Sequence, residues 1–301
     1  MRSHLYCLVA ICLFSTIEVG SKALGSGVNP NAIAAWRFLI GGAVILPFAL
    51  RQMVIRKLQL NISSILKIAV LGILNVCISM LLLQWSVFWG KASLSAIIVA
   101  SNPLFVTVFA WLLLSEKLGL KHLAGLGLGL IGLILIIAGE SDLNATSRDL
   151  GLGIALALGA AITFGLYTVL AKRLLSEFGN PVVNSFSFLS GAAVLFLVNI
   201  LRGQSMGIET NLTNMLGITY LGLFVTGLAY ILFFESLKNL PAAQASMYFF
   251  LKPVVSSLLA YFILSELLSP LQIGGVLAII LSLSAGYWLG LLFPKSREAL
   301  R

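Results

Sequence analysis

The chain has 301 residues, of which 59% are hydrophobic and only 10% are charged. A soluble domain carries about 45–50% apolar and roughly 25% charged residues, and disordered chains are poor in apolar residues, so the composition excludes both classes and predicts a chain solvated by lipid. The net charge of +9 is not gathered in one patch, which argues against nucleic-acid binding.

Apolar segments long enough to cross a membrane follow one another along the chain. Such a helix needs about 20 mostly apolar residues, and the loops between the segments are short, so neighbouring helices should be antiparallel. We expect an all-α membrane protein with ten transmembrane helices near 5–25, 31–50, 67–88, 92–114, 121–139, 150–172, 181–201, 213–236, 241–264 and 270–292. Glu18 and Lys22 stand where a signal peptide would be cleaved, so the first helix should be retained.

The loop charges predict the orientation of these helices. With the N-terminus placed inside, thirteen of the 19 Lys and Arg residues fall on the cytoplasmic side, three fall outside and three lie within spans. Because basic loop residues remain cytoplasmic, we expect a multi-pass protein of the cell (inner) membrane with both termini in the cytoplasm.

The sequence repeats itself at an offset of 150 residues. Leu114-Ser115-Glu116 recurs as Leu264-Ser265-Glu266, and Pro103 recurs as Pro253. Further matches include Gly41 with Gly191, Leu71-Gly72 with Leu221-Gly222 and Ala92 with Ala242. We therefore divide the chain into a first repeat at 1–140, a second at 150–292 and a cytoplasmic tail at 293–301. Each repeat holds five helices, so the second copy enters the membrane inverted, which is a transporter architecture.

The repeated motifs resemble the EamA-type members of the drug/metabolite transporter superfamily. In the first half the resemblance rests on Ala92-Ser93, Asn102-Pro103-Leu104-Phe105, Leu114-Ser115-Glu116-Lys117-Leu118 and Gly125. In the second half it rests on Ala242-Ala243, Lys252-Pro253-Val254, Ser265-Glu266-Leu267 and Gly275. The pair Arg37-Phe38 in the second helix is also similar. It implies ten helices, cytoplasmic termini and movement of small metabolites, often outward. The first helix departs from the common small-aromatic pair, since it reads Ser15-Thr16-Ile17-Glu18-Val19.

Ionisable residues inside the spans are the first candidates for a site, because each costs about 2.5–3.5 kcal/mol to insert. Glu18 and Lys22 are four residues apart and share a helix face, and Arg37 lies about two turns into the second helix. These three are expected to meet near the outer mouth of a cavity. They form either a structural ion-pair cluster or a site in which Glu18 binds an amine or a proton and Lys22 or Arg37 binds a carboxylate.

Lys252 is the sharpest single signal. It precedes Pro253 near the middle of the ninth helix, and the equivalent pair in the fourth helix is Asn102-Pro103. Proline breaks a helix, and broken helices at matching positions of two inverted halves point to a central site. A midplane lysine there would hold an anionic group, whereas an ordinary lysine would extend to the interface.

Other polar and aromatic side chains are candidates for lining the route. Each is alternatively a packing or interface residue. They are Asn75, Ser79, Gln84, Trp85, Thr163, Tyr167, Tyr230 and Tyr248. Glu235 is expected to pair with Lys238 at an interface, and Glu116 and Glu266 are expected to be structural carboxylates near the starts of the fifth and tenth helices.

The sequence thus predicts a secondary transporter and no enzyme, because it has no P-loop and no catalytic motif. The three cysteines are unclustered, so we expect no disulfide framework, metal or other cofactor. Export of an amino acid or related polar metabolite is the first hypothesis. Efflux of drugs or aromatic compounds, carboxylate uptake, a membrane scaffold and an intramembrane enzyme remain alternatives. The partners are a small molecule and the bilayer; substrate identity, proton coupling, direction and oligomeric state stay open.

Overall fold

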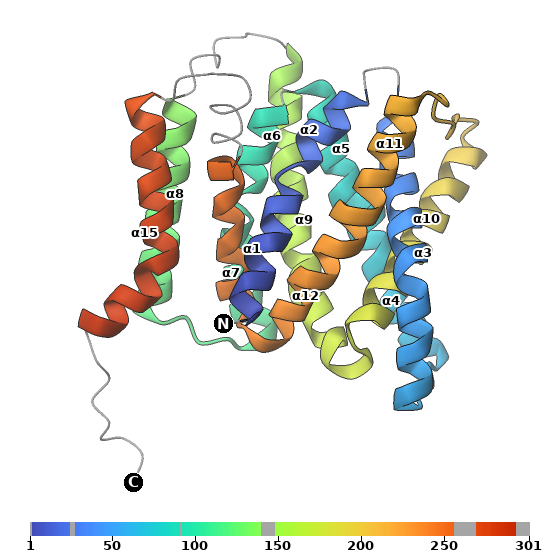
Figure 1. Cartoon of the computed structure of the whole chain (residues 1–301), viewed down its shortest axis with the longest axis horizontal. Coiled ribbons are helices and arrows are strands. Elements are labelled where there is room, and N and C mark those ends of the chain that lie inside the picture. The colour runs from blue at the N-terminus through green and yellow to red at the C-terminus, as the bar shows by residue number, and fades with distance from the viewer. Residues whose placement is uncertain (1, 25–27, 91, 140–147, 256–268, 293–301) are drawn as a thin grey trace.

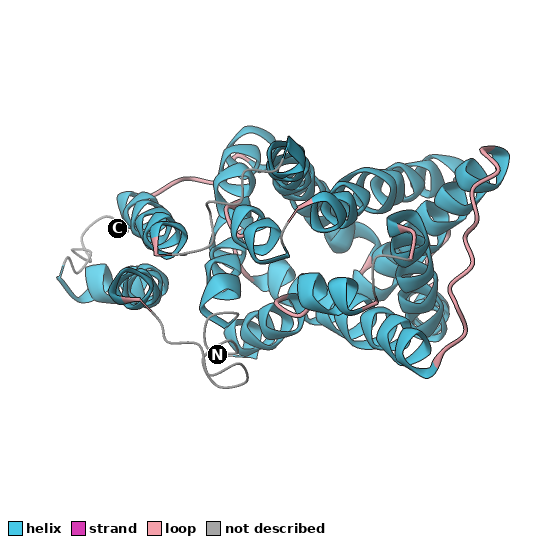
Figure 2. Ribbon diagram, turned by 90° about the horizontal axis from the view of Figure 1, so that it is seen from above, coloured by secondary structure: helices cyan, strands magenta, loops and turns pink. Residues whose placement is uncertain are grey.

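The computed structural model describes residues 2–24, 28–90, 92–139, 148–255 and 269–292, and within these ranges the chain is helical and contains no strand. The helices run roughly parallel or antiparallel to one another (Figure 1). Seen from above, they form a main group with the α8–α15 pair at one end (Figure 2). The fold is therefore an all-α bundle, as the composition predicts.

The first half follows the expected order of spans. The first span is split into α1 (Arg2–Phe14) and α2 (Ile17–Ala23), and α3 (Pro30–Arg56) begins after the cap residue Asn29. Next come α4 (Ile62–Gly72), η1 (Ile73–Ser79) and α5 (Met80–Trp89), which together form one span. The half ends with α6 (Ala92–Val99), α7 (Asn102–Leu114) and α8 (Leu120–Ala138).

The second half repeats this order. It contains α9 (Arg148–Phe178), α10 (Asn180–Leu201), then α11 (Leu212–Tyr220), η2 (Leu221–Leu228) and α12 (Ala229–Asn239) as one span. The ninth helix begins as α13 (Ala242–Ser246) and η3 (Met247–Phe250), and α15 (Pro270–Leu292) is the last helix.

Seven helices within the described ranges are long and apolar enough to cross a membrane. Two shorter apolar helices, His122–Ala138 and Pro270–Leu283, lie at the expected fifth and tenth positions. The expected ninth helix is described only as far as residue 255, and residues 256–268, Glu266 and the tail at 293–301 lie outside the described part of the chain. The structure therefore supports a multi-pass bundle but does not establish the count of ten.

Equivalent helices of the two halves pack against each other in opposite directions. Asn31, near the start of α3, donates a hydrogen bond of 2.6 Å to Asn199, near the end of α10. Likewise Ser269, just before α15, donates to the carbonyl of Gly139, just after α8 (3.2 Å). Antiparallel pairing of equivalent helices is what two oppositely oriented repeats would produce.

The third and eighth helices share an irregularity at matching positions. The segments η1 and η2 are both π-helical, and each lies inside an otherwise α-helical span. A π turn inserts an extra residue into the helix and is frequent at functional sites. The segment η1 packs on α10 and η2 packs on α3, so each irregular segment contacts the second helix of the other half.

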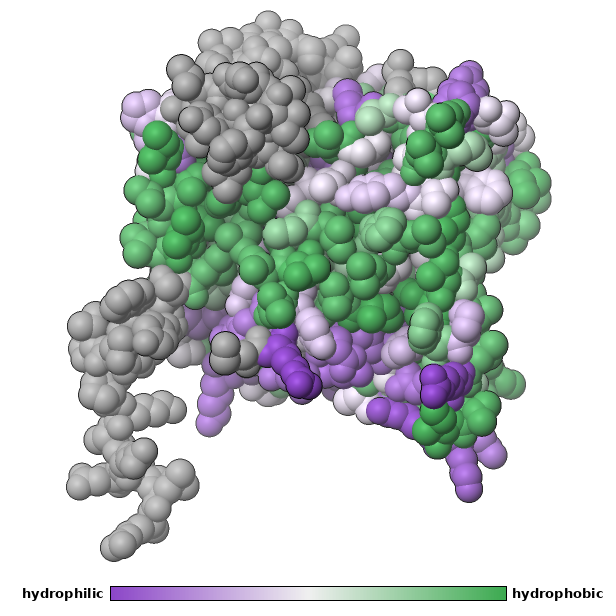
Figure 3. All heavy atoms as spheres, in the orientation of Figure 1, coloured by the Kyte–Doolittle hydropathy of each residue, from purple (hydrophilic) through white to green (hydrophobic). Residues whose placement is uncertain are grey.

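The surface has the banding of a membrane protein. Apolar side chains cover the middle of the molecule, and hydrophilic ones gather along the edge that holds the start of α1 (Figure 3). We call this edge the amino-terminal face; it contains Arg56, Glu116 and Lys172. The edge that contains Leu24 and Gly139 is called the opposite face.

Candidate central charged site

A buried ion pair joins the first and ninth helices. Lys252 Nζ lies 2.6 Å from Glu18 Oε1, and each side chain is only 1% exposed. Burying two charges costs several kcal/mol per ion before their attraction repays it. This cost makes the pair the first candidate for a functional site in the interior.

Broken helices position both members of the pair. Between α1 and α2, the hydroxyls of Ser15 and Thr16 donate to the carbonyls of Ile11 and Leu13, each at 2.7 Å. Such back-bonding competes with the helical hydrogen-bond pattern, and α2 restarts with Glu18 in its first turn, where the helix dipole favours a carboxylate.

Two prolines interrupt the fourth and ninth helices at equivalent places. Pro103 cannot donate a hydrogen bond to residue 99, and the chain turns between Val99 and Asn102. Pro253 likewise cannot donate to residue 249, and the 3-10 segment η3 ends at Phe250. Irregular backbone inside a membrane is tolerated where it is buried in protein or lines a cavity, and here it places Asn102 and Lys252 in the interior.

Arg37 contributes a third buried charge. It is 0% exposed, and its three nitrogens have no hydrogen-bond partner among the described residues. The guanidinium carbon lies 4.6 Å from the centre of the Phe38 ring, and the charge interacts electrostatically with Tyr230 and Glu18. All three guanidinium nitrogens of Arg37 can therefore donate hydrogen bonds, and none has an acceptor among the described residues.

Further polar atoms in the interior have no hydrogen-bond partner. Glu18 Oε2, both side-chain polar atoms of Asn75 and Asn102 Oδ1 are buried and form no hydrogen bond with any described residue. Asn102 donates to the carbonyl of Ala161 (3.0 Å), and Ser79 donates to that of Ala160 (3.3 Å). Buried polar groups are normally hydrogen-bonded, so these atoms are the candidates for contacting a ligand.

An aromatic layer separates the ion pair from the amino-terminal face. Tyr230 is buried, and its ring contacts those of Phe14 (5.0 Å between centroids) and Phe188 (4.9 Å). Tyr167 is also buried, and its hydroxyl is 3.5 Å from Asn184 Oδ1. Phe14 and Phe249 stack at 5.9 Å. The layer closes the interior toward this face.

Lys22 and Tyr248 lie apart from the central cluster. Lys22 is exposed and donates to the carbonyl of Val87 (3.3 Å), so the expected pairing of Lys22 with Glu18 is not what the structure shows. Lys252, 234 residues away, takes that place. Tyr248 lies at the amino-terminal face, where its hydroxyl is 2.7 Å from His4 Nδ1.

A small pocket opens near the pair on the opposite face. Its volume is about 70 Å³, and Ser21, Lys22 and Gln84 line it. Ser21 Oγ and Gln84 Nε2 are buried without a partner. Neither Glu18 nor Lys252 lines it, but Ser21 follows Glu18 by about one turn of α2, so the pocket lies about one helical turn from Glu18 on the side of the opposite face.

The carboxylate of Glu116 holds three segments together at the amino-terminal face. It accepts hydrogen bonds from Lys172 Nζ (2.8 Å) and from the backbone N–H groups of Ala242 (2.8 Å) and Ala243 (3.3 Å). Lys172 also donates to the carbonyl of Leu240 (2.7 Å). Glu116 therefore lies at a helix start, as expected for a structural carboxylate, but that helix is the ninth rather than the fifth.

The pKa of Glu116 reflects these contacts. Burial raises the pKa of this carboxyl, but the hydrogen bond and charge of Lys172 and the two backbone donors together outweigh burial, so the pKa lies below its ordinary value. The carboxylate is thus held in its charged form.

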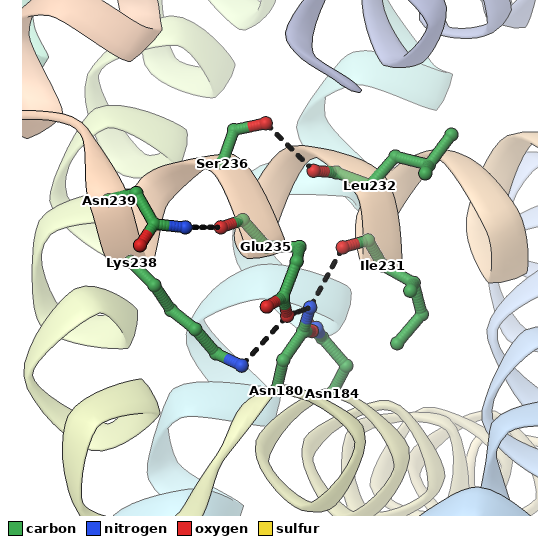
Figure 4. A network of polar contacts seen from close by, with 8 residues as sticks. All are labelled: Asn180, Asn184, Ile231, Leu232, Glu235, Ser236, Lys238 and Asn239. Carbon is green, nitrogen blue, oxygen red and sulfur yellow. Dashed lines mark hydrogen bonds and ion pairs between the residues drawn. The ribbon is translucent and has the colours of Figure 1, made fainter. Parts of the chain in front are cut away.

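A second ion pair lies nearby on α12. Lys238 Nζ is 2.7 Å from Glu235 Oε2, the interface pair that the sequence predicts. Asn180 donates to the same oxygen (3.0 Å) and to the carbonyl of Ile231 (2.8 Å), which ties α10 to α12 (Figure 4). Together with the contacts of Glu116, these contacts hold together the ends of α9, α10, α12 and α13 at the amino-terminal face.

The site also contains residues that sequence reasoning missed. Ser21 and Thr226 hold buried atoms without a partner among the described residues, yet small polar residues are common in membrane helices and give no separate signal. Asn75 lies in η1 and Thr226 lies in η2. No residue pattern predicts a π-helical turn. The described residues contain no group of three or more His, Cys, Asp or Glu side chains that would hold a metal.

The bundle of apolar helices and the buried charged interior define a multi-pass membrane protein. The sequence model of the EamA-like transporter family matches residues 1–138 and again 151–285. The chain belongs to the EamA-like transporter family.

Relatives and a solved structure agree with this assignment. An "uncharacterized transporter" of Clostridium kluyveri is 31% identical and covers 95% of this chain and 93% of its own. The "uncharacterized transporter YyaM" of Bacillus subtilis is 25% identical over 85% of this chain and 84% of its own. A chloroplastic "WAT1-related protein" of Arabidopsis thaliana is 25% identical over 87% of this chain and 64% of its own. A crystal structure with 22% identity covers 97% of this chain and 99% of its own with a TM-score of 0.79, which shows the shared fold.

Proposed function

We propose that this membrane transporter moves a small zwitterionic metabolite, most simply an amino acid, and that it exports the substrate by alternating access. The two halves would be residues 1–140 and 150–292 in inverted orientation, in the inner membrane with both termini in the cytoplasm. The basic amino-terminal face supports this orientation, because Lys and Arg accumulate on the cytoplasmic side.

The Glu18–Lys252 pair carries the proposal. A zwitterion has one ammonium and one carboxylate, and the described part of the interior offers one buried carboxylate and two buried cations. The substrate ammonium would bind Glu18, whose Oε2 is unpaired, and its carboxylate would bind Lys252 or the unpaired guanidinium of Arg37. When the substrate leaves, Lys252 and Glu18 neutralise each other again at 2.6 Å. The two residues thus compensate each other's charge in the empty site, which supports a cycle of binding and release.

Flux through proteoliposomes tests the proposal. We expect wild-type protein to exchange a labelled zwitterionic amino acid and the double variant Glu18→Gln/Lys252→Met to lose at least about 100-fold of that flux, since two charged contacts are removed. Lys67→Met is the matched control, because Lys67 is an exposed lysine on α4 that lines neither of the two pockets described, and it should keep its flux.

The substrate panel decides between the alternatives. It contains zwitterionic amino acids, a monocarboxylate and a lipophilic aromatic cation. Flux of the cation or of the carboxylate without flux of any zwitterion would contradict the proposal, as would full zwitterion flux by the double variant.

A further inference from the structure

We propose that the amino-terminal face contains a second binding site, separate from the central one, for a phosphoryl anion. A pocket of about 500 Å³ lies between the ends of α3, α7, α9 and α12. Four basic residues line it (Arg56, Lys172, Arg173 and Lys238), against the single carboxylate of Glu116. Neither Glu18 nor Lys252 lines it, so the site does not depend on the proposed substrate.

The charges of this pocket are unbalanced. Lys172 is neutralised by Glu116, and Lys238 is neutralised by Glu235. The guanidinium groups of Arg56 and Arg173 form no ion pair or hydrogen bond with any described residue, and both side chains are exposed. Arg56 interacts with Glu235 only through its charge. The four cations therefore outnumber the two carboxylates Glu116 and Glu235 by two, and a dianion would balance this excess.

The donor chemistry favours a phosphoryl group among dianions. Arginine presents parallel N–H donors that match phosphate oxygens in a bidentate manner. Basic pockets between membrane helices bind lipid phosphate head groups, and the apolar residues Val54 and Ile55, which precede Arg56 on α3, are 79% and 69% exposed. The phosphoryl group therefore comes either from an anionic lipid or from a soluble phosphate compound, and both present the same chemistry to the two arginines.

Binding would also reach the contact network of Glu116. Lys172 lines the pocket and bonds both Glu116 and the carbonyl of Leu240. An anion beside Lys172 competes with Glu116 for the same ammonium. Occupancy of the pocket would thus weaken the fastening between α9 and the start of the ninth helix.

The test uses the full chain in nanodiscs and measures its thermal unfolding midpoint. One arm uses phosphatidylcholine alone and titrates inorganic phosphate and glycerol phosphate against chloride at equal ionic strength. The other arm replaces part of the lipid with phosphatidylglycerol, and mass spectrometry of the intact complex counts the retained lipid. We expect a saturable rise of the midpoint in at least one arm, because a ligand that binds only the native state stabilises it.

Matched variants separate a site from general surface charge. Arg56→Gln/Arg173→Gln should raise the apparent dissociation constant at least about tenfold. Arg51→Gln/Lys117→Gln removes the same charge from exposed residues outside the pocket lining and should leave the constant unchanged. A response only to soluble phosphate identifies a soluble ligand, and a response only to phosphatidylglycerol identifies a lipid. Equal losses in both variants, or no response in either arm, would overturn the proposal.

Discussion

Individual charges in the interior differ in how they are compensated. Glu18 and Lys252 neutralise each other, whereas Arg37 is buried with no hydrogen-bond partner among the described residues. Removing one member of a buried ion pair leaves the other charge uncompensated, which destabilises the fold. Removing a buried charge that has no partner instead takes away an uncompensated charge. The two cases therefore predict opposite effects on stability.

For the pair, Glu18→Gln and Lys252→Met should each lower the free energy of unfolding by about 3–5 kcal/mol. The double variant should recover most of that loss, because no unpaired charge remains. Thermal unfolding of the four proteins in detergent measures this double-mutant cycle. Additive losses in the double variant would show that the two residues do not act as a pair.

For Arg37, the substitution Arg37→Met should leave the unfolding midpoint unchanged or raise it, while zwitterion flux falls at least about tenfold through loss of one charged contact. Parallel thermal and flux measurements on the same preparation give both values. A strongly destabilised protein would instead indicate that Arg37 holds the fold together.

At this scale the sequence predicts which residues are exceptional but not which ones meet. Membrane burial alone singles out Glu18, Arg37 and Lys252. Spacing favours Glu18 with Lys22, yet the break at Ser15 and Thr16 and the kink before Pro253 bring Lys252 to Glu18 instead. A contact across 234 residues depends on tertiary packing that local spacing does not contain.

Helices cross closely at two equivalent places. A side chain on Gly72 would collide with the backbone of Ser187, and one on Gly222 with the side chain of Ile40. The two glycines are 150 residues apart, and each packs against the second helix of the other half, α10 for Gly72 and α3 for Gly222. Small residues let membrane helices approach in this way.

Gly72→Ala should therefore destabilise the protein by about 1–3 kcal/mol through overpacking. Gly127→Ala, on α8, is the matched control, because a Cβ there meets nothing within 4 Å, and its better helix propensity should leave stability unchanged or improve it. Thermal midpoints of the two variants provide the comparison; equal midpoints would show that the close crossing is unimportant.

The contacts of Glu116 give the end of the bundle a pH dependence. Because the pKa of Glu116 is lowered in the native state, its stabilisation is present above the unfolded-state pKa and is lost as the pH falls through the native pKa. Glu116→Gln should lower the unfolding midpoint at pH 7 but not in acid. The exposed Glu177→Gln on the same face is the control. A difference between Glu116→Gln and wild type that stays constant down to low pH would contradict this role.

Breaks in the helices were predictable from the sequence where a particular residue type causes them. The prolines predict the breaks of the fourth and ninth helices, and the repeated Leu-Gly pair lies at the start of both irregular segments. The π turns themselves were not predictable, since they change only the number of residues per turn. Glu116 was expected beside the start of the fifth helix, α8. In the structure it accepts a hydrogen bond from Ala242, at the start of the ninth helix.

The whole molecule combines a duplicated sequence with a charged interior. Composition and periodicity predict the class, and the antiparallel pairing of α3 with α10 and of α8 with α15 is what inverted halves would give. Such symmetry matters for transport because two similar halves can exchange conformations around one site. Direction and substrate are not readable from this pattern, because they depend on the energies of the two states.

Alternating exposure of the central site is the most direct consequence of this account. In a variant lacking Cys7, Cys12 and Cys77, Asn102→Cys places a thiol in the interior, where Asn102 is 0% exposed. Ser176→Cys, exposed at the amino-terminal face, reports vesicle sidedness. The measurement is labelling by a membrane-impermeant maleimide added to vesicles of either orientation. We predict that the thiol at position 102 is labelled from both sides and the thiol at 176 from one. Labelling of position 102 from neither side, or from only one side under all conditions, would contradict the account.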